Sequence, residues 1–195
     1  MFETSQEIHQ SHPRTITLPL CRCQYLPHNL GHHKDIIREF RPSYNEYFLY
    51  ICLVLKERAA CLKEAVGSII VKQNKIISTG YNGTPVGTTN CYNGGCLVCN
   101  NSEKMGTEVL GCRCIHAEYN CILKAGITAT PGSVLYSTKL PCLWCAKLII
   151  QGRVSQVICI RSKYSSLEYE NVELVKKTLR EGKVLVEEMD IPYHD

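Results

Sequence analysis

Residues 134–160 read VLYSTKLPCLWCAKLIIQGRVSQVICI, and this stretch decides the fold class. The apolar run at 134–138 is typical of a buried strand. Helical spacing follows at 142–151, and Gly152 ends that helix. A second apolar run at 156–160 predicts another strand. A strand, a helix and a strand in this order indicate an α/β domain.

The alternation of helices and strands extends outward on both sides of this stretch. We expect helices over Tyr44–Ala60, Ile115–Lys124 and Leu167–Glu181, and strands over Val66–Val71, Lys75–Gly80 and Lys183–Glu187. The first two of these strands predict a β-hairpin. Ser43 and Glu46 have the spacing of a capping box, which predicts a helix start directly after Ser43. Together the elements predict a three-layer α/β/α domain with a five-stranded sheet between the helices.

The composition is that of an ordinary globular protein. Of the 195 residues, 45% are hydrophobic and 21% are charged, which excludes disorder over most of the chain and favours a single domain with its own core. The formal charge is +4 and no run of five basic residues occurs. A small anionic substrate therefore fits as well as a nucleic acid does.

The sequence carries no pattern for export or for membrane insertion. The first ten residues, MFETSQEIHQ, lack the basic and apolar regions of a secretory signal. The apolar run at 47–55 is too short to span a bilayer. We therefore expect a soluble, intracellular protein of the cytoplasm that makes no contact with a membrane.

Residues 1–41 differ in composition from the rest of the chain. They are rich in His, Pro, Ser and Gln and show no sustained period, which predicts a poorly ordered N-terminal extension. Cys21 and Cys23 lie in it among several histidines, so an extra metal site is an alternative. Their spacing matches no familiar zinc finger, and a solvated tail is the favoured interpretation. The main domain is expected at 42–189, followed by a short tail at 190–195.

His116, Cys142 and Cys145 combine ligand types that zinc favours. One imidazole and two thiols make three protein ligands, which is the number that leaves a fourth position open for water at a catalytic zinc. Both ligand groups fall at predicted helix starts, where partial positive charge stabilises thiolates. Glu118 follows His116 by two residues, so its carboxylate can exchange protons with that water.

The pattern H-x-E followed by P-C-x-x-C also matches the signature of zinc-dependent nucleobase deaminases. The alternative is a zinc-knotted interaction module in which Glu118 is merely a solvated helix residue. The acidic residue between the ligands argues against that alternative, because a purely structural site does not need it.

The remaining cysteines divide into two kinds. Cys52, Cys121 and Cys159 lie in apolar stretches, and we expect them to be buried packing residues. Six others are grouped around an irregular, cysteine-rich insertion at about 87–113: Cys61, Cys91, Cys96, Cys99, Cys112 and Cys114. An insertion so poor in apolar residues cannot fold by burial, so a structural zinc is expected to hold it. Reduced, unligated thiols in a mobile loop are the alternative.

Five motifs extend the resemblance beyond the zinc signature. They are RPSYNEYF at 41–48, GYNGTP at 80–85, NCYNGGC at 90–96, CIHAEYNCILKAG at 114–126 and PCLWCAKLIIQG at 141–152. With them, the chain resembles the deoxycytidylate (dCMP) deaminases over roughly residues 42–189. The resemblance implies a cytidine-deaminase-like fold with a mixed five-stranded sheet. It also implies hydrolytic, zinc-dependent deamination of dCMP to dUMP and ammonia, which supplies dUMP for thymidylate synthesis, and commonly a homohexamer controlled by dCTP and dTTP.

The resemblance implies a role for individual residues. His116, Cys142 and Cys145 hold the catalytic zinc, and Glu118 moves a proton from water to N3 and then to the departing amine. Further positions are implied to contact the substrate: Asn82 the nucleoside, the backbone N–H of Ala117 the pyrimidine O2, and Tyr164 the nucleotide pocket. Ser165 and Ser166 follow Tyr164 where the family usually has an Asp, so contacts from that loop are expected to differ.

The resemblance also implies ligands for the second, structural zinc. Cys61 and Cys91 match ligand positions in related deaminases, and Cys114 lies where such enzymes place another ligand. As the fourth ligand, Cys99 is favoured over Cys96. Cys114 is favoured as a ligand over the neighbouring Cys112. The expected metal content is one catalytic and one structural zinc.

Two other functions share the same zinc motif. A tRNA adenosine or polynucleotide cytosine deaminase would be expected to carry a more basic surface or stacking aromatic residues. The chain has one Trp, three Phe and no basic run, so no nucleic-acid partner is expected. A catalytically inert binding protein on the same fold is the second alternative, and measuring ammonia release separates the three.

Overall fold

A mixed five-stranded sheet forms the centre of the molecule, with the strand order β2-β1-β3-β4-β5. The computed structural model describes residues 41–100, 112–162 and 166–191, and those from Pro42 onward belong to one compact unit. The strands are β1 (Gly67–Lys72), β2 (Lys75–Tyr81), β3 (Val134–Ser137), β4 (Gln156–Ile160) and β5 (Leu185–Met189). β1 is antiparallel to both β2 and β3, whereas β3, β4 and β5 run parallel.

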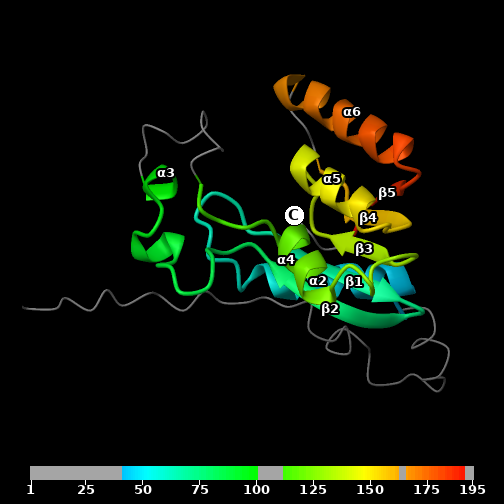
Figure 1. Ribbon diagram of the computed structural model, residues 1–195, viewed down its shortest axis with the longest axis horizontal. Coiled ribbons are helices and arrows are strands. Elements are labelled where there is room, and N and C mark those ends of the chain that lie inside the picture. Colours follow the sequence, from blue (N-terminus) through cyan, green and yellow to red (C-terminus); the bar gives the residue numbers. More distant parts are fainter. Residues whose placement is uncertain (1–40, 101–111, 163–165, 192–195) are drawn as a thin grey trace, which may run out of the picture. The chain divides into compact units, whose positions relative to one another are not determined.

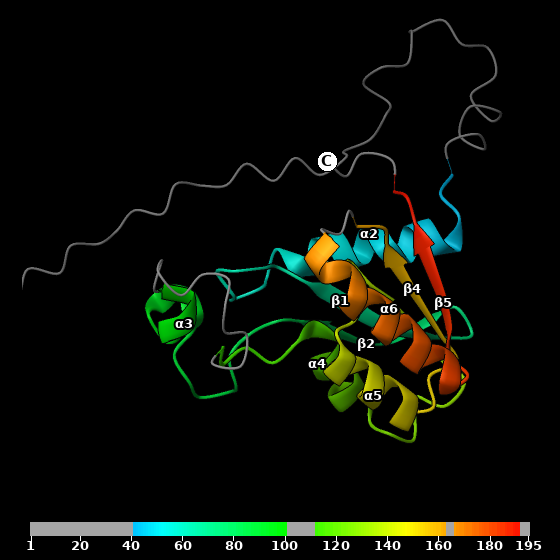
Figure 2. The same ribbon diagram turned by 90° about the horizontal axis from the view of Figure 1, so that it is seen from above.

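Helices cover both faces of the sheet (Figures 1 and 2). The long helices are α2 (Tyr44–Lys56), α4 (Ala117–Ala125), α5 (Leu143–Gln151) and α6 (Ser166–Glu181). α2 packs on one face, and the other three pack on the opposite face, as Figure 2 shows. The predicted three-layer α/β/α fold with a mixed five-stranded sheet is therefore confirmed.

The cysteine-rich insertion adds only two short elements to this framework. They are the 3₁₀ turn η2 (Cys91–Asn93) and the single-turn helix α3 (Leu97–Asn100). Both stand away from the helices that cover the sheet (Figures 1 and 2). Elements this short gain little stability from their own hydrogen bonds, so side-chain contacts must hold them.

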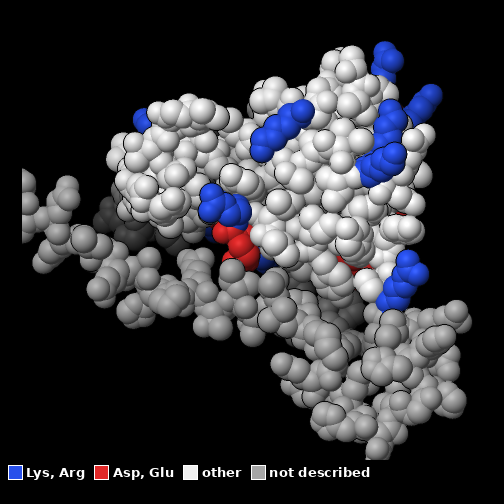
Figure 3. All heavy atoms as spheres, turned by 90° about the horizontal axis from the view of Figure 1, so that it is seen from below, with Lys and Arg blue, Asp and Glu red and all other residues white. Residues whose placement is uncertain are grey.

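Basic side chains are dispersed over one face of the molecule. On the face shown in Figure 3, Lys and Arg side chains stand at several separate places and do not merge into one continuous basic surface. Among the described residues, no helix combines the length and the apolar character needed to cross a bilayer.

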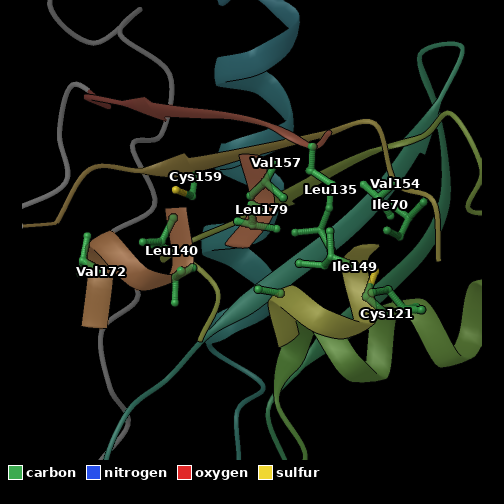
Figure 4. Packing of buried hydrophobic residues seen from close by; sticks show 14 residues of the cluster. Ile70, Cys121, Leu135, Leu140, Ile149, Val154, Val157, Cys159, Val172 and Leu179 are labelled. Carbon is green, nitrogen blue, oxygen red and sulfur yellow. The ribbon is translucent and has the colours of Figure 1, made fainter. Parts of the chain in front are cut away.

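Alternation along the strands divides the core between the two faces of the sheet. Ile69 of β1 belongs to the cluster that contains Phe48 of α2. The neighbouring Ile70 faces the other way, into a cluster with Ile149 of α5 and Leu179 of α6 (Figure 4). A strand buried on both faces reads as a continuous apolar run, because every side chain meets a helix layer.

The β1–β2 hairpin brings β2 close to α4. Gln73 and Asn74 turn the chain with φ of 51° and 58°, which suits the twist of a two-residue hairpin. Farther along β2, Gly80 lies directly under α4, because a Cβ there would come within 2.2 Å of the Ala117 carbonyl oxygen. The absence of a side chain at Gly80 thus lets the first turn of α4 rest on the sheet.

The helix start predicted from Ser43 and Glu46 is confirmed. The Ser43 hydroxyl accepts a hydrogen bond from the Glu46 N–H, and the Glu46 carboxylate accepts one from the Ser43 N–H at 2.7 Å. α2 nevertheless ends at Lys56 and not at Ala60. The Ala60 N–H donates to the Asn82 carbonyl at 3.0 Å, so the chain there bonds to the turn after β2.

The last strand lies two residues later than predicted. Its observed bounds are Leu185–Met189, whereas the apolar alternation suggested 183–187. Lys183 has a φ of 60° in the turn that follows α6, so it cannot be extended. The chain becomes a strand only after this left-handed residue.

Candidate metal centre

The first turns of α4 and α5 carry the residues that the sequence singled out. His116 is the N-cap of α4 and Cys142 is the N-cap of α5, each with an extended backbone. Cys145 and Glu118 follow inside the first turns of α5 and α4. The helices begin there because the backbone carbonyls of the two N-caps accept the first helical hydrogen bonds, at 3.0 and 2.8 Å.

His116, Cys142 and Cys145 form a set of candidate metal ligands, since their ligand atoms all lie within 4.8 Å of one another. The Nδ1 atom of His116 lies 3.4 Å from Sγ of Cys142 and 3.5 Å from Sγ of Cys145. A tetrahedral zinc with ordinary Zn–N and Zn–S bonds separates nitrogen from sulfur by about 3.5 Å. The three side chains therefore fit a zinc ion.

Proton sharing among these side chains favours a thiolate at Cys142. A hydrogen bond from the Cys145 thiol, helped by one from His116, lowers the pKa of Cys142 to about 4. The hydrogen bond to Cys142 correspondingly raises the pKa of both His116 and Cys145. The group thus carries one thiolate readily, which is the form of cysteine that binds metal.

Glu118 is buried next to this set of ligands, with 4% of its surface exposed. Its Oε2 lies 3.7 Å from Sγ of Cys145. Burial raises the pKa of the Glu118 carboxyl group above its ordinary value. A carboxyl group whose pKa is raised in this way holds a proton more readily than an exposed one, which suits a group that accepts and returns protons.

Asn82 is buried in the turn after β2, and its side chain is engaged with the backbone. Its Oδ1 accepts from the Val66 N–H at 2.8 Å, and its Nδ2 donates to the Glu64 carbonyl at 2.6 Å. One N–H and one lone pair remain for another partner. Asn82 therefore holds the segment before β1, a role that the sequence did not suggest.

The other two predicted substrate contacts differ in how far the structure describes them. Ala117 is buried and is the first residue of α4, so its N–H is among those without a partner inside the helix. Tyr164 lies outside the described residues.

The insertion brings a second group of thiols together. The predicted ligands Cys61, Cys91, Cys99 and Cys114 lie in one cluster, which also contains Cys96 and Cys112. Within it, the four thiols that are all within 4.8 Å of one another are Cys91, Cys96, Cys99 and Cys112. Cys61 and Cys114 form a second set with Cys112. The structure thus brings the expected cysteines together with two that were ranked behind them.

A sequence signal for one of these two residues was present. Cys96 and Cys99 have the C-x-x-C spacing that is common among zinc ligands, whereas the prediction favours Cys99 over Cys96. No spacing rule distinguishes Cys112 from Cys114, since the two are separated by one residue only.

Fold and site together define a metal-binding α/β protein whose centre is built at the N-termini of two neighbouring helices. The chain belongs to the family of cytidine and deoxycytidylate deaminases with a zinc-binding region, whose family model matches residues 42–161. The zinc-binding region of this family supports zinc as the metal for this type of domain.

Curated relatives agree with this assignment. The chain is 42% identical over 120 residues to a deoxycytidylate deaminase of Schizosaccharomyces pombe, which covers 61% of this chain and 37% of that protein. It is 40% identical over 130 residues to the deoxycytidylate deaminase of Saccharomyces cerevisiae, covering 66% of this chain and 41% of that protein. The matched region thus spans about two fifths of each fungal relative.

A solved structure shares the fold over a larger part of the chain. It is the dCMP deaminase of the cyanophage S-TIM5, solved in complex with dCMP and dUMP. The two are 28% identical with a TM-score of 0.58, over 77% of this chain and 99% of the phage chain.

Proposed function

We propose that this protein is a zinc-dependent hydrolase that converts dCMP to dUMP and ammonia, and so supplies dUMP for thymidylate synthesis. The observation that carries the proposal is the buried carboxylate of Glu118 beside the ligand set His116, Cys142 and Cys145. A structural metal site has no need of such a carboxylate, whereas hydrolysis requires a group that transfers protons. The two fungal deoxycytidylate deaminases and the phage enzyme with dCMP bound support this substrate.

Each residue of the site has a role in the proposed reaction. His116, Cys142 and Cys145 would hold a zinc ion, which supplies Lewis-acid activation of water. Glu118 takes a proton from water and passes it to N3 of the pyrimidine while the water oxygen forms a bond to C4. It then passes the proton of the new C4 hydroxyl to the amine, and the C4–N bond breaks to release ammonia. Its position 3.7 Å from Cys145 Sγ keeps the carboxylate next to the ligand set without making it a ligand.

Substrate contacts are part of the same proposal. The N–H of Ala117, which has no partner inside α4, is suited to bind the pyrimidine O2. Asn82 keeps one N–H and one lone pair with which to contact the nucleoside. Tyr164 is proposed to line the nucleotide pocket.

The dispersed charge supports a small nucleotide over a polynucleotide. On the face shown in Figure 3 the basic side chains do not form a continuous surface of the kind that suits a nucleic-acid backbone. The formal charge of +4 over the whole chain is also modest.

A homohexamer regulated by dCTP and dTTP completes the proposal. Exposed apolar side chains on the outer face of α4, with Tyr119 45% and Leu123 65% exposed, support association between subunits. Sedimentation and dCMP saturation curves with either nucleotide test this part. A monomer with hyperbolic kinetics that neither nucleotide alters would refute it.

The cytoplasm is the proposed location. Every cysteine in the described part of the chain is a free thiol, which fits a reducing compartment.

The activity is tested by incubating the purified full chain with dCMP, dCTP, cytidine and a short single-stranded DNA, and measuring the ammonia released. We expect release from dCMP alone or with strong preference. Preference for DNA would replace the proposal with a polynucleotide deaminase, and no release from any substrate would indicate an inert binding protein.

A further inference from the structure

Six cysteines in and next to the insertion lie together, outside the candidate catalytic site. This six-thiol cluster consists of Cys61, Cys91, Cys96, Cys99, Cys112 and Cys114. They come from three separate parts of the chain: the segment before β1, the η2–α3 region, and the residues just before α4. The cluster therefore connects the insertion to the segment before β1 and to the segment before α4.

The distances between sulfur atoms in the cluster are close to those between two sulfurs bound to one metal ion. The Sγ–Sγ distances are 3.2 Å for Cys91 and Cys114, 3.5 Å for Cys99 and Cys112, and 4.0 Å for Cys61 and Cys99. Two sulfurs on one tetrahedral zinc lie about 3.8 Å apart. A disulfide would need about 2.0 Å, so these contacts are not disulfide bonds.

One ion cannot use all six thiols. The four-thiol set of Cys91, Cys96, Cys99 and Cys112 already fills a tetrahedral site. Cys61 and Cys114 would then remain without a metal, although both lie within 4.8 Å of Cys112 and each touches a member of the first set. Two tetrahedral ions that share two sulfurs use all six thiols and leave none over.

We propose that the six-thiol cluster binds two zinc ions that share thiolates. Cys112 is one shared ligand, because it belongs to both sets. Two contacts offer the second shared ligand: Cys91 at 3.2 Å from Cys114, or Cys99 at 4.0 Å from Cys61. Six thiolates with two zinc ions carry the same net charge as four thiolates with one, so the second ion adds no net charge to be buried.

The surroundings of the cluster show why metal is needed there. Besides the six cysteines, Val98 is the one other residue in this core cluster as the structure describes it. η2 and α3 are too short to be stable on their own, and burial of one valine cannot hold them. The Asn100 amide donates to the carbonyls of Cys91 and Cys96, both at 2.8 Å. These two bonds orient the loop, but they connect only residues of the insertion with one another. Zinc binding supplies the folding free energy that such segments cannot gain by burial.

Zinc content tests the proposal directly. The protein is the full chain carrying Cys21→Ser and Cys23→Ser, so that the N-terminal thiols add nothing to the count. After exhaustive dialysis under reducing conditions, we expect three zinc ions per chain by elemental analysis. Adding Cys142→Ser to weaken the catalytic site should leave the two ions of the cluster. A count of one in that variant, or iron in place of zinc, would overturn the proposal.

One ligand variant and its control locate the ions. Cys61→Ser removes a thiol that lies outside the four-thiol set, so we expect it to lose one zinc of the cluster and keep the other. Cys52→Ala, at a buried cysteine of α2 outside the cluster, is the matched control and should lose none. Full zinc content in Cys61→Ser would contradict the two-ion cluster.

Cadmium NMR tests whether thiolates are shared. With the NMR-active isotope of cadmium in place of zinc, the cluster should give two resonances with scalar coupling transmitted through a common sulfur. A single resonance, or two without coupling, would overturn the sharing. Neither measurement depends on turnover, so an inactive chain would refute the proposed deaminase function and leave this inference standing.

Discussion

Glu118 combines a charged side chain with nearly complete burial. A carboxylate taken out of water is costly unless it is hydrogen-bonded. The Glu118 carboxylate interacts with its own backbone N–H and with the Cys145 thiol, and with 4% exposure it has little contact with solvent. The position is therefore unfavourable for stability alone, which is consistent with a role in proton transfer.

Replacing Glu118 by Gln tests that role at constant volume. We expect zinc content to be unchanged and dCMP turnover to fall by at least about 10²-fold, because proton transfer by a positioned side chain contributes about 10²–10⁴-fold. Elemental analysis and ammonia release measure the two quantities. Glu173→Gln, at an exposed position of α6, is the control. Activity of the Glu118 variant within tenfold of wild type would remove Glu118 from the mechanism.

At the scale of elements, the start of α2 depends on a reciprocal pair of side chains. Ser43→Ala removes the cap and should lower the free energy of unfolding by about 0.5–2 kcal/mol. Urea unfolding at neutral pH measures the change. A free energy of unfolding equal to that of wild type would mean that the capping box does not stabilise α2.

The same cap predicts a pH dependence. Hydrogen bonds from Ser43 lower the pKa of Glu46 below 4.5. Because the folded pKa is the lower one, this stabilisation is present above pH 4.5 and is lost as the pH falls through the folded pKa. The difference in stability between wild type and Glu46→Gln should therefore shrink in acid. Acid also releases zinc from thiolates, so the difference between the two proteins is the quantity to follow.

Gly80 sets the distance between β2 and α4. An added Cβ would meet the Ala117 carbonyl at 2.2 Å and the Cys121 amide nitrogen at 2.8 Å, both of them backbone atoms. Gly80→Ala should push the start of α4 away, lower stability by about 1–3 kcal/mol and reduce turnover. Gly83→Ala is the matched control, since its Cβ would meet Ala60 at an ordinary 3.8 Å. Equal stability and activity in both variants would contradict this account.

Local patterns were sufficient to predict most elements and to single out His116, Cys142 and Cys145, which the structure brings together. The capping box, the hairpin and the helix starts at His116 and Cys142 depend on neighbouring residues, so the sequence alone predicts them. The end of α2 depends on a hydrogen bond to Asn82, which is distant in sequence. Cys61, Cys91, Cys99 and Cys114 were expected together, but which thiols form the four-thiol set could not be predicted, because η2 and α3 follow no apolar period and are placed by thiol contacts.

At the scale of the whole molecule, the outer face of α4 is the proposed contact between subunits. Leu123→Glu places a charge among exposed apolar side chains, so we expect a smaller species in sedimentation with an unchanged circular dichroism spectrum. Leu174→Glu, at a leucine of α6 that is 47% exposed, is the matched control. A mass that Leu123→Glu leaves unchanged would exclude this face as the interface.

The order of the metal ligands along the chain has a consequence for biosynthesis. Every cysteine of the six-thiol cluster precedes His116, and the candidate catalytic ligands end at Cys145, before β4, α6 and β5. A ribosome therefore delivers both sets of ligands before it has made the last two strands. Since metal binding and folding are coupled, zinc supply acts on the nascent chain. In a zinc-starved cell the defect would arise during translation, because the part of the chain that carries the ligands would remain unfolded while the last strands are still being made.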